Sequence, residues 1–165
     1  MDAPSDLDLA LLRRAFARAG EARARGDRPF AAIIATAEGR ILAEGLSTQG
    51  VSGGGTLAHS EMNACAQVIA AGVPRATLRA ATIYSSGEPC AMCAAAIFYT
   101  GLGRVVYGLS AGAILHLRNA RPENAGLSLS CRAVLDTAAE RVTVLGPLLE
   151  EEGAIPHRGY WTAAQ

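Results

Sequence analysis

The stretch Gly87-Glu88-Pro89-Cys90-Ala91-Met92-Cys93, taken together with His59-Ser60-Glu61 upstream, is the part of this chain around which the rest is organised. Pro89 suits the first position of a helix, and residues three apart on a helix project from one face, so both thiols can reach one ion. The free N–H groups and positive dipole end of a first helical turn stabilise thiolates, the form of cysteine that binds zinc. The pattern predicts a metal site with two cysteine ligands.

His59 supplies a third ligand from the start of another expected helix. Three ligands leave a fourth position open for water, as a catalytic zinc requires. Zinc lowers the pKa of that water toward neutrality and makes hydroxide available. Glu61 can exchange protons with the water without competing as a ligand. These parts suit attack of zinc-bound hydroxide on an amino-bearing ring carbon, with Glu61 as the proton shuttle and ammonia as the product.

A structural zinc site is the alternative interpretation of the same residues. Cys65 or Cys131 would then close the shell as a fourth ligand, and the protein would be a zinc-stabilised interaction domain. That interpretation leaves Glu61 and the placement of Pro89 unexplained. We expect Cys65 to face the core and Cys131 to begin a helix.

Composition and charge limit the class of protein. The chain has 165 residues, half of them hydrophobic, which predicts a single globular domain spanning residues 1–165. The net charge is zero and all 15 basic residues are arginines, so a nucleic-acid partner is disfavoured. The N-terminus shows no secretory pattern and no apolar run is long enough to span a membrane, which makes the cytoplasm the expected location.

Apolar periodicity predicts strands that alternate with helices after an initial hairpin. The resulting fold class is α/β, a three-layer α/β/α domain with a mixed five-stranded sheet. Residues 147–165 are expected to form a C-terminal tail that could cover the active site. The expected elements are a helix at 6–26, strands at 30–37 and 40–46, a glycine-rich loop at 47–56, a helix at 58–71, a strand at 81–85, a helix at 89–100, a strand at 104–109, a helix at 110–118, a loop at 119–130, a helix at 131–139 and a strand at 141–145.

Arginines recur along the first expected helix. They could form a phosphate-binding stripe, but a solvated helix face is the favoured interpretation. The residues are Arg13, Arg14, Arg18, Arg23 and Arg25.

The paired motifs resemble those of the cytidine/deoxycytidylate deaminase superfamily of zinc-dependent nucleobase and nucleoside deaminases. The similarity extends through Phe30–Gly45, Ala58–Ala71 and Tyr84–Gly108. Within the superfamily, the stretch Gly103-Arg104-Val105-Val106-Tyr107-Gly108 after the cysteines resembles guanine deaminases and bacterial tRNA adenosine deaminases. The resemblance implies a cytidine deaminase-like fold, bound Zn²⁺, a homodimer, and a small purine-like base or nucleoside as substrate. A tRNA-specific adenosine deaminase is the alternative, and a catalytically inactive relative is disfavoured because the four site residues are intact.

Two departures from the family pattern bear on the substrate. Ser60 stands where a small residue such as alanine is usual. The base-binding asparagine that follows the second strand in these branches is absent, because the chain reads Gly45-Leu46-Ser47-Thr48 there. Ser47 or Thr48 could bind the base instead, since a hydroxyl can both donate and accept. By analogy with guanine deaminases the tail could place an aromatic ring on the base, or Trp161 could simply pin the tail to the core. The candidate substrate contacts are Phe30, Ser47, Thr48, Ala58, Ser86, Tyr160 and Trp161.

Overall fold

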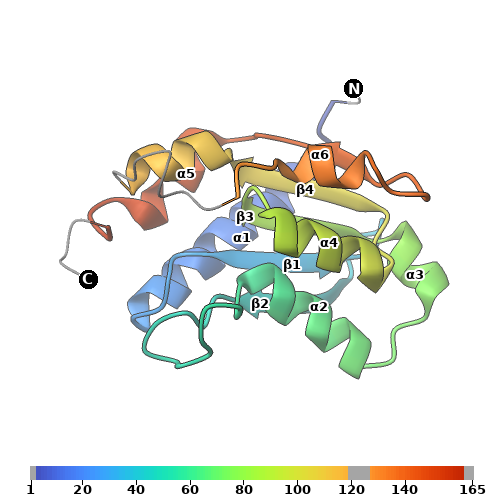
Figure 1. Cartoon of the computed structure of the whole chain (residues 1–165), viewed down its shortest axis with the longest axis horizontal. Helices are drawn as coiled ribbons and strands as arrows, with labels where there is room; N and C mark the ends of the chain where they lie inside the picture. Colours follow the sequence, from blue (N-terminus) through green and yellow to red (C-terminus); the bar gives the residue numbers. More distant parts are fainter. Residues whose placement is uncertain (1–2, 119–126, 162–165) are drawn as a thin grey trace.

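The computed structural model describes residues 3–118 and 127–161 (Figure 1). Residues 119–126 of the expected loop, and the last four residues of the expected tail, lie outside this described part. Within it, no helix is both long enough and apolar enough to cross a membrane.

A mixed sheet of five strands forms the centre of the molecule, as predicted. Its spatial order is β2-β1-β3-β4-β5; β1 runs antiparallel to β2 and β3, whereas β4 runs parallel to β3 and β5. β1 is buried along its whole length, because a central strand covered on both faces has no solvated side. The strands are β1 (Ala31–Ala35), β2 (Ile41–Leu46), β3 (Thr82–Gly87), β4 (Arg104–Leu109) and β5 (Thr143–Leu145).

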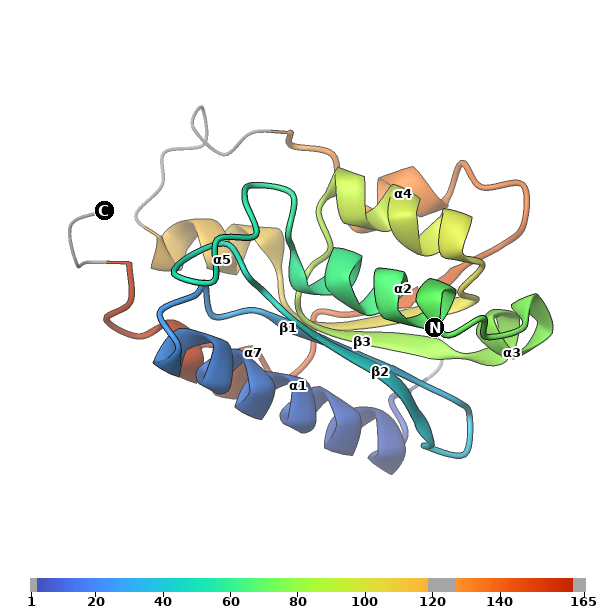
Figure 2. The same cartoon turned by 90° about the horizontal axis from the view of Figure 1, so that it is seen from below.

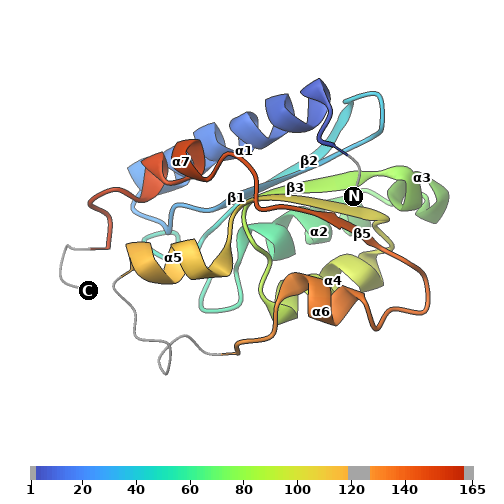
Figure 3. The ribbon, with the colours of Figure 1, turned by 90° about the horizontal axis from the view of Figure 1, so that it is seen from above.

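Helices cover both faces of the sheet, which confirms the three-layer prediction. In Figures 2 and 3, α1 and α7 lie on one face, and α2, α4 and α6 lie on the other. α3 and α5 lie at opposite ends of the sheet. The helices are α1 (Asp6–Ala24), α2 (Ser60–Ala70), α3 (Arg75–Ala80), α4 (Ala91–Thr100), α5 (Ala111–Leu117), α6 (Cys131–Leu135) and α7 (Glu150–Gly153), followed by the 3₁₀ helix η2 (Ile155–His157).

The strand residues divide between two cores by alternation. Ile34, Ile83 and Val105 belong to the core beneath α2 and α4, whereas their chain neighbours Ile33 and Tyr84 belong to the core beneath α1. Successive side chains of a strand point to opposite faces, so each central strand contributes to both cores. The sheet is therefore fixed from both sides, and the loops at its ends can carry the site.

Several element boundaries differ from the prediction. Cys90 is the N-cap of α4, so Pro89 precedes the helix instead of opening it. α1 ends at Ala24 and Gly26 follows with a φ of 90°, a left-handed conformation that suits glycine. The helix α3 was not predicted, and α6 is shorter than expected. Both have six residues or fewer, too few turns for an apolar period to stand out in the sequence.

Asp8 fastens α1 to the sheet. The Arg104 guanidinium donates to both of its carboxylate oxygens, at 2.6 and 2.9 Å, and the Tyr84 hydroxyl donates to Oδ1 at 3.0 Å. Asp8 also forms a capping box with Ser5 at the helix start. Burial alone would raise the pKa of Asp8, but the hydrogen bonds from Arg104 and Ser5 outweigh it and hold this pKa well below its usual range.

We expect Asp8→Asn to lower the free energy of unfolding by about 3 kcal/mol at pH 7, because it leaves Arg104 without its carboxylate partner. A depressed folded-state pKa adds stability above the unfolded-state value, which is 3.8, and this contribution is lost as the pH falls toward the lower folded-state pKa. The difference between wild type and variant should therefore shrink below about pH 4. Urea unfolding at pH 7 and at pH 3.5 measures both quantities. Asp6→Asn, at an exposed position in the same helical turn, is the control; an equal loss there would contradict the assignment.

Candidate active site

The three predicted metal ligands meet at the adjacent N-terminal ends of two helices. His59 is the N-cap of α2, Cys90 is the N-cap of α4, and Cys93 lies in the first turn of α4. In Figures 1 and 2 these two helices lie side by side, with their first turns directed toward α5. The fold thus brings Cys90 and Cys93 to His59, although they follow it by 31 and 34 positions in the chain.

The spacing of the ligand atoms fits a tetrahedral zinc ion. The Nδ1 atom of His59 lies 3.8 Å from the Cys90 sulfur and 3.5 Å from the Cys93 sulfur, and the two sulfurs are 3.7 Å apart. Typical zinc–sulfur and zinc–nitrogen bonds of about 2.3 and 2.0 Å would separate tetrahedral ligand atoms by about 3.8 Å between sulfurs and about 3.5 Å between sulfur and nitrogen. The donor atoms therefore match the predicted ion in type and position.

The site offers three ligands, not four. Among residues 3–118 and 127–161, the cluster of groups able to hold a metal consists of His59, Cys90 and Cys93. Cys65 and Cys131 are packed in the core beneath α2 and α4, as expected. Burial raises the pKa of Cys65 to about 11 and that of Cys131 to about 12, so both remain neutral thiols. This arrangement favours an open, catalytic site over a closed structural one.

The charge state of the cysteines prepares the site for a cation. Hydrogen bonding with Cys93 and with the His59 imidazole lowers the pKa of Cys90 to about 4. The pKa of Cys93 is raised, first by its hydrogen bond to the Cys90 sulfur and then by burial. The pair thus holds one thiolate beside one thiol, and a divalent cation that binds both displaces the remaining proton.

Glu61 lies in the first turn of α2, beside the metal ligands. Only 6% of it is exposed, and this burial raises the pKa of its carboxyl group. The Ser60 hydroxyl donates to Oε2 at 2.9 Å, and the Ser85 hydroxyl from β3 donates to Oε1 at 3.2 Å. The unusual serine between histidine and glutamate therefore orients the carboxylate. Sequence reasoning noted Ser60 but missed Ser85, because only the sheet brings β3 beneath α2.

A cavity of about 340 Å³ opens onto these residues, a size suited to a small ligand. His59, Cys90 and Glu61 line it, and α5 contributes the apolar side chains of Ile114 and Leu115. Glu88 also lines the cavity, but its two oxygens accept hydrogen bonds from the backbone N–H groups of Ala111 and Cys131, at 3.0 and 3.2 Å. Glu88 therefore holds the first turns of α5 and α6 at the cavity wall, a role that the sequence did not reveal.

The candidate substrate contacts occupy different places. Phe30 lines the cavity, and so does Gln49, which was not predicted. The Ser47 hydroxyl is buried and accepts from the Gln49 backbone N–H, and the Thr48 hydroxyl accepts from Asn63. Direct contact of Ser47 and Thr48 with substrate remains a prediction.

The remaining candidates outside the tail are engaged within the protein. The Ser86 hydroxyl is buried and accepts from the Ala31 N–H, and the Ala58 carbonyl accepts from the Thr48 N–H. These hydrogen bonds help to shape the site, and direct contact of Ser86 or Ala58 with a substrate remains a prediction.

The C-terminal tail reaches two residues of the cavity. The Trp161 indole donates to Nδ1 of His157 at 3.2 Å, and the buried His157 ring lies edge-on to Phe30 with centroids 4.9 Å apart. The Arg118 guanidinium lies 5.1 Å from the centre of the Trp161 ring, and Tyr160 packs edge-on against Trp161. Trp161 therefore anchors the tail and also lies beside the cavity wall.

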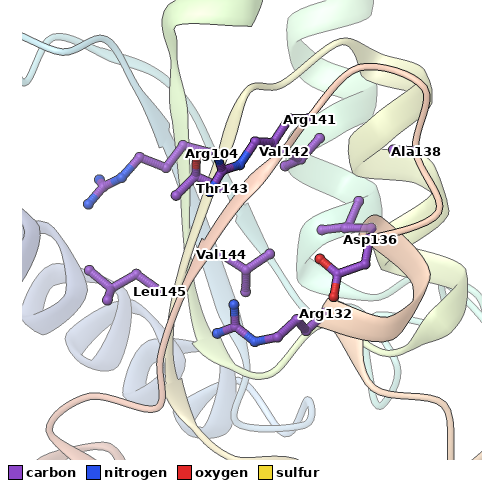
Figure 4. Close-up of a pocket in the computed structure, with 10 residues that line it drawn as sticks. Arg104, Arg132, Asp136, Ala138, Arg141, Val142, Thr143, Val144 and Leu145 are labelled. Atoms are coloured by element: carbon purple, nitrogen blue, oxygen red, sulfur yellow. The ribbon is translucent and has the colours of Figure 1, made fainter. Parts of the chain in front are cut away.

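A second hollow, of about 500 Å³, lies along the edge strand β5 (Figure 4). Its lining includes Arg132, Asp136 and Val144, from α6 and β5. Arg104 also lines it, but its side chain points away from Val144 and Asp136 in Figure 4 and forms the ion pair with Asp8 of α1. This hollow is larger than the catalytic cavity, but within the described part of the chain it includes no metal-ligating cluster.

The arginines of α1 do not form a free phosphate-binding stripe. Carboxylates pair with them: Arg13 with Glu152 at 2.8 Å, Arg14 with Glu44 at 2.5 Å, and Arg18 with Glu21. Arg23 donates to two backbone carbonyls of the tail, and Arg25 lies 3.4 Å from Asp27. The interpretation as a solvated, ion-paired face is thus the one that the structure supports.

Gly45 permits the close approach of β2 to α2. A Cβ atom there would lie 2.1 Å from the Ser60 carbonyl oxygen and 2.5 Å from the Ala64 nitrogen, both of them backbone atoms. We expect Gly45→Ala to displace the first turn of α2, to lower stability by about 2 kcal/mol, and to reduce kcat more than it changes the KM. Urea unfolding and steady-state kinetics measure these effects. Gly20→Ala in α1, where a Cβ atom meets nothing within 4 Å, is the control, and equal losses in both variants would contradict the argument.

Hydrolysis of a C–N bond on an amidine-like ring needs a metal-activated water and a carboxylate that exchanges protons with it, and this cavity provides for both. The fold and the site therefore define a zinc-dependent deaminase, a hydrolase of C–N bonds. The chain belongs to the cytidine and deoxycytidylate deaminase family, because residues 5–109 match the sequence model of that family's zinc-binding region.

Individual relatives agree with this assignment. A probable cytosine deaminase of Schizosaccharomyces pombe is 34% identical over 157 residues, covering 95% of this chain and 94% of the relative. A tRNA-specific adenosine deaminase of Haemophilus influenzae is 33% identical over 106 residues, which are 64% of this chain and 60% of the relative. The crystal structure of a guanine deaminase from Nitrosomonas europaea shares the fold with a TM-score of 0.72 at 23% identity, covering 99% of this chain and 87% of that one.

Proposed function

We propose that this protein hydrolytically deaminates a small amino-substituted heterocycle, either a free base or a nucleoside. The observation that carries the proposal is the buried carboxylate of Glu61, held by two serine hydroxyls beside the three metal ligands in a small cavity. Water replaces the amino group, so the products are a ring carbonyl and ammonia.

Zinc bound by His59, Cys90 and Cys93 would supply a water of lowered pKa. Glu61 takes a proton from this water at one carboxylate oxygen and passes it to a ring nitrogen of the substrate. It then carries the second proton to the departing amino group, so that ammonia leaves as a neutral molecule. Its raised pKa suits both steps, since a carboxyl group shielded from solvent holds a transferred proton more readily. Ser60 and Ser85 keep the carboxylate oriented between water and ring.

Two kinds of ring are supported for different reasons. The purine-like substrate rests on the resemblance of the motifs to guanine deaminases. A pyrimidine of the cytosine type is supported by the Schizosaccharomyces pombe relative, which matches nearly the whole of this chain. Both rings carry the amino group on an amidine-like carbon, so the same residues serve either one.

Ammonia release from zinc-loaded protein tests the proposal. The panel contains cytosine, cytidine, guanine, guanosine, adenine, adenosine and aminopterins, and the Glu61→Gln variant provides the blank. We expect the wild type to turn over at least one compound that the blank does not turn over. Turnover that persists in the blank would rule out Glu61 as the proton carrier.

A tRNA adenosine deaminase is the second candidate, supported by the relative from Haemophilus influenzae. The zero net charge and the ion-paired arginines of α1 count against it, because a protein that grips RNA presents unpaired positive charge to the phosphates. A gel-shift assay with tRNA at increasing salt discriminates between the candidates. Tight binding that weakens steeply with salt, together with inosine formation, would favour the tRNA substrate.

We propose a homodimer that buries the outer surface of α2 and α4. These helices pack side by side, and large apolar residues remain exposed on both, with Ile69 62% and Tyr99 81% exposed. Exposed apolar side chains on neighbouring helices are typical of an interface. Light scattering after size exclusion should give the mass of two chains for wild type and of one chain for the double variant Ile69→Glu, Tyr99→Glu. A wild-type protein of one-chain mass would contradict the proposal.

A cytoplasmic location and a closing tail complete the proposal. Four free thiols, two of them metal ligands, suit a reducing compartment. In this proposal residues 147–165 form a tail of the single domain that covers the active site; in support, Trp161 lies against Arg118 at the cavity. Cell fractionation tests the location, and Trp161→Ala, expected to raise the KM, tests the tail.

A further inference from the structure

Two arginines of the catalytic cavity have no ion-pair partner among residues 3–118 and 127–161. Arg28, just before β1, and Arg118, the C-cap of α5, both line the cavity and are both partly buried. This sets them apart from the arginines of α1, most of which pair with carboxylates. Within the described part of the chain, nothing neutralises this pair of positive charges at the site, which needs an explanation.

The positive charges of Arg28 and Arg118 repel each other. Burial and the positive charge of Arg28 lower the pKa of Arg118. Like charges that are partly removed from water destabilise the folded state unless an opposite charge joins them. The arrangement is thus unfavourable for the empty protein and favourable once an anion is bound.

The carboxylates that line the same cavity are already engaged. Glu88 accepts from two backbone N–H groups, and Glu61 accepts from two serine hydroxyls. The ion pairs of the described residues include none between Glu61 or Glu88 and either arginine. As far as residues 3–118 and 127–161 are concerned, both guanidinium groups therefore keep their N–H donors for a ligand.

Trp161 holds Arg118 in place. The guanidinium carbon lies 5.1 Å from the centre of the indole ring, a contact that restrains the side chain. A guanidinium that stacks through its face keeps the N–H donors at its edge free, and that edge matches the two oxygens of a carboxylate or phosphate. Phe30, Ile114 and Leu115 add apolar side chains to the same lining, and these suit a flat ring.

Resting on the proposed function, we propose that the substrate is an amino-heterocycle that carries an anionic group, a carboxylate or a phosphate, bound by Arg28 and Arg118. The ring lies against the apolar wall with its amino-bearing carbon toward Glu61. The anion lies between the two guanidinium groups and neutralises both. The specificity of this deaminase is then decided at the arginines as well as at the ring, and neutral bases are poor substrates.

Binding to matched pairs of compounds tests the inference. Each pair differs by the anion: cytosine and 5-carboxycytosine, pterin and pterin-6-carboxylate, cytidine and cytidine 5′-monophosphate, guanosine and guanosine 5′-monophosphate. The carboxylate pairs and the phosphate pairs distinguish the two sources of charge. Isothermal titration uses the zinc-loaded Glu61→Gln variant, which cannot consume the ligand, and ammonia release uses the wild type.

We expect one anionic member to bind on the order of 10- to 100-fold more tightly than its neutral partner, as charge-assisted hydrogen bonds do. Arg118→Gln and Arg28→Gln should each remove most of this preference, while Arg118→Lys should keep part of it. Arg132→Gln, in the hollow beside β5, should leave it unchanged. Zinc content and thermal unfolding of each variant show that the site remains folded.

The two proposals fail in different ways. Ammonia release from neutral members with no preference for their anionic partners would uphold the deaminase function and overturn the anion site. Selective binding of anionic members without ammonia release in the wild type would uphold the anion site and overturn the proposed reaction. Absence of binding by every anionic member, or equal losses for both members of a pair in the arginine variants, would also overturn the anion site.

Discussion

Replacing Glu61 with glutamine should lower kcat by ~10,000-fold, the upper end of the range for general acid–base catalysis, because in the proposed reaction the same carboxylate serves two proton transfers in each turnover. Glutamine has nearly the same shape and can still hydrogen-bond to Ser60 and Ser85, so the cavity keeps its form. It cannot take up a proton from water at neutral pH. Zinc content should therefore stay at the wild-type level, and the KM should change little.

Steady-state kinetics, metal analysis and thermal unfolding check this result together. Because a buried carboxylate is costly to desolvate, the glutamine variant should unfold at the same temperature as wild type or a higher one. Glu151→Gln, at an exposed position on α7, is the control and should keep full activity. More than a tenth of wild-type activity in the Glu61→Gln variant would mean that another group carries the proton.

Replacing Cys93 with alanine should abolish both zinc binding and activity. Cys93 is fully buried and its sulfur lies within 3.7 Å of the other two ligand atoms, and the metal-ligating cluster of the described residues holds no fourth member that could replace it. The loss of zinc affinity should exceed the roughly 10- to 100-fold that the loss of a supporting hydrogen bond costs a metal site, because a ligand itself is removed. Wild-type protein should also unfold at a lower temperature after chelation, since an ion that binds only the folded state stabilises it.

Metal content after dialysis and the unfolding temperature with and without added zinc measure these effects. Cys65→Ala is the matched control, a buried cysteine of α2 beside the same core. It should cost some stability but leave zinc and activity in place. Loss of zinc in this control would instead support a closed site in which Cys65 is a fourth ligand, and so an interaction domain.

Much of the fold and the centre of the site could be predicted because the signals are local. The continuous apolar run of β1, buried along its whole length, and the helical spacing of apolar residues in α1 are each contained in one short stretch of chain, so they can be recognised without knowledge of the fold. The ligand pair Cys90 and Cys93 is of the same kind, since one helical turn brings both sulfurs to one ion. His59 and Glu61 are likewise fixed relative to each other by two positions of chain.

The helix α3 escaped prediction, and α6 was predicted too long, for the opposite reason. The helix α3 and the shortened α6 have too few residues to show a period, and their ends depend on what they pack against. Cys90 was expected inside the first turn and is the N-cap, because the loop after β3 sets where the helix begins. Such boundaries are decided by contacts outside the segment itself.

The sequence by itself determined that the chain is an α/β domain with a histidine, two cysteines and a glutamate in the arrangement of a zinc-dependent deaminase. Only the tertiary structure decided which side chains surround that centre. It placed the Ser85 hydroxyl within hydrogen-bond distance of Glu61, and it placed the Glu88 carboxylate against the first backbone N–H groups of α5 and α6. It also brought Arg28 and Arg118 to one cavity from positions far apart in the chain. The physical reason is that a residue's spacing along a helix or strand is fixed by backbone geometry, whereas its neighbours across the fold depend on how the whole chain packs.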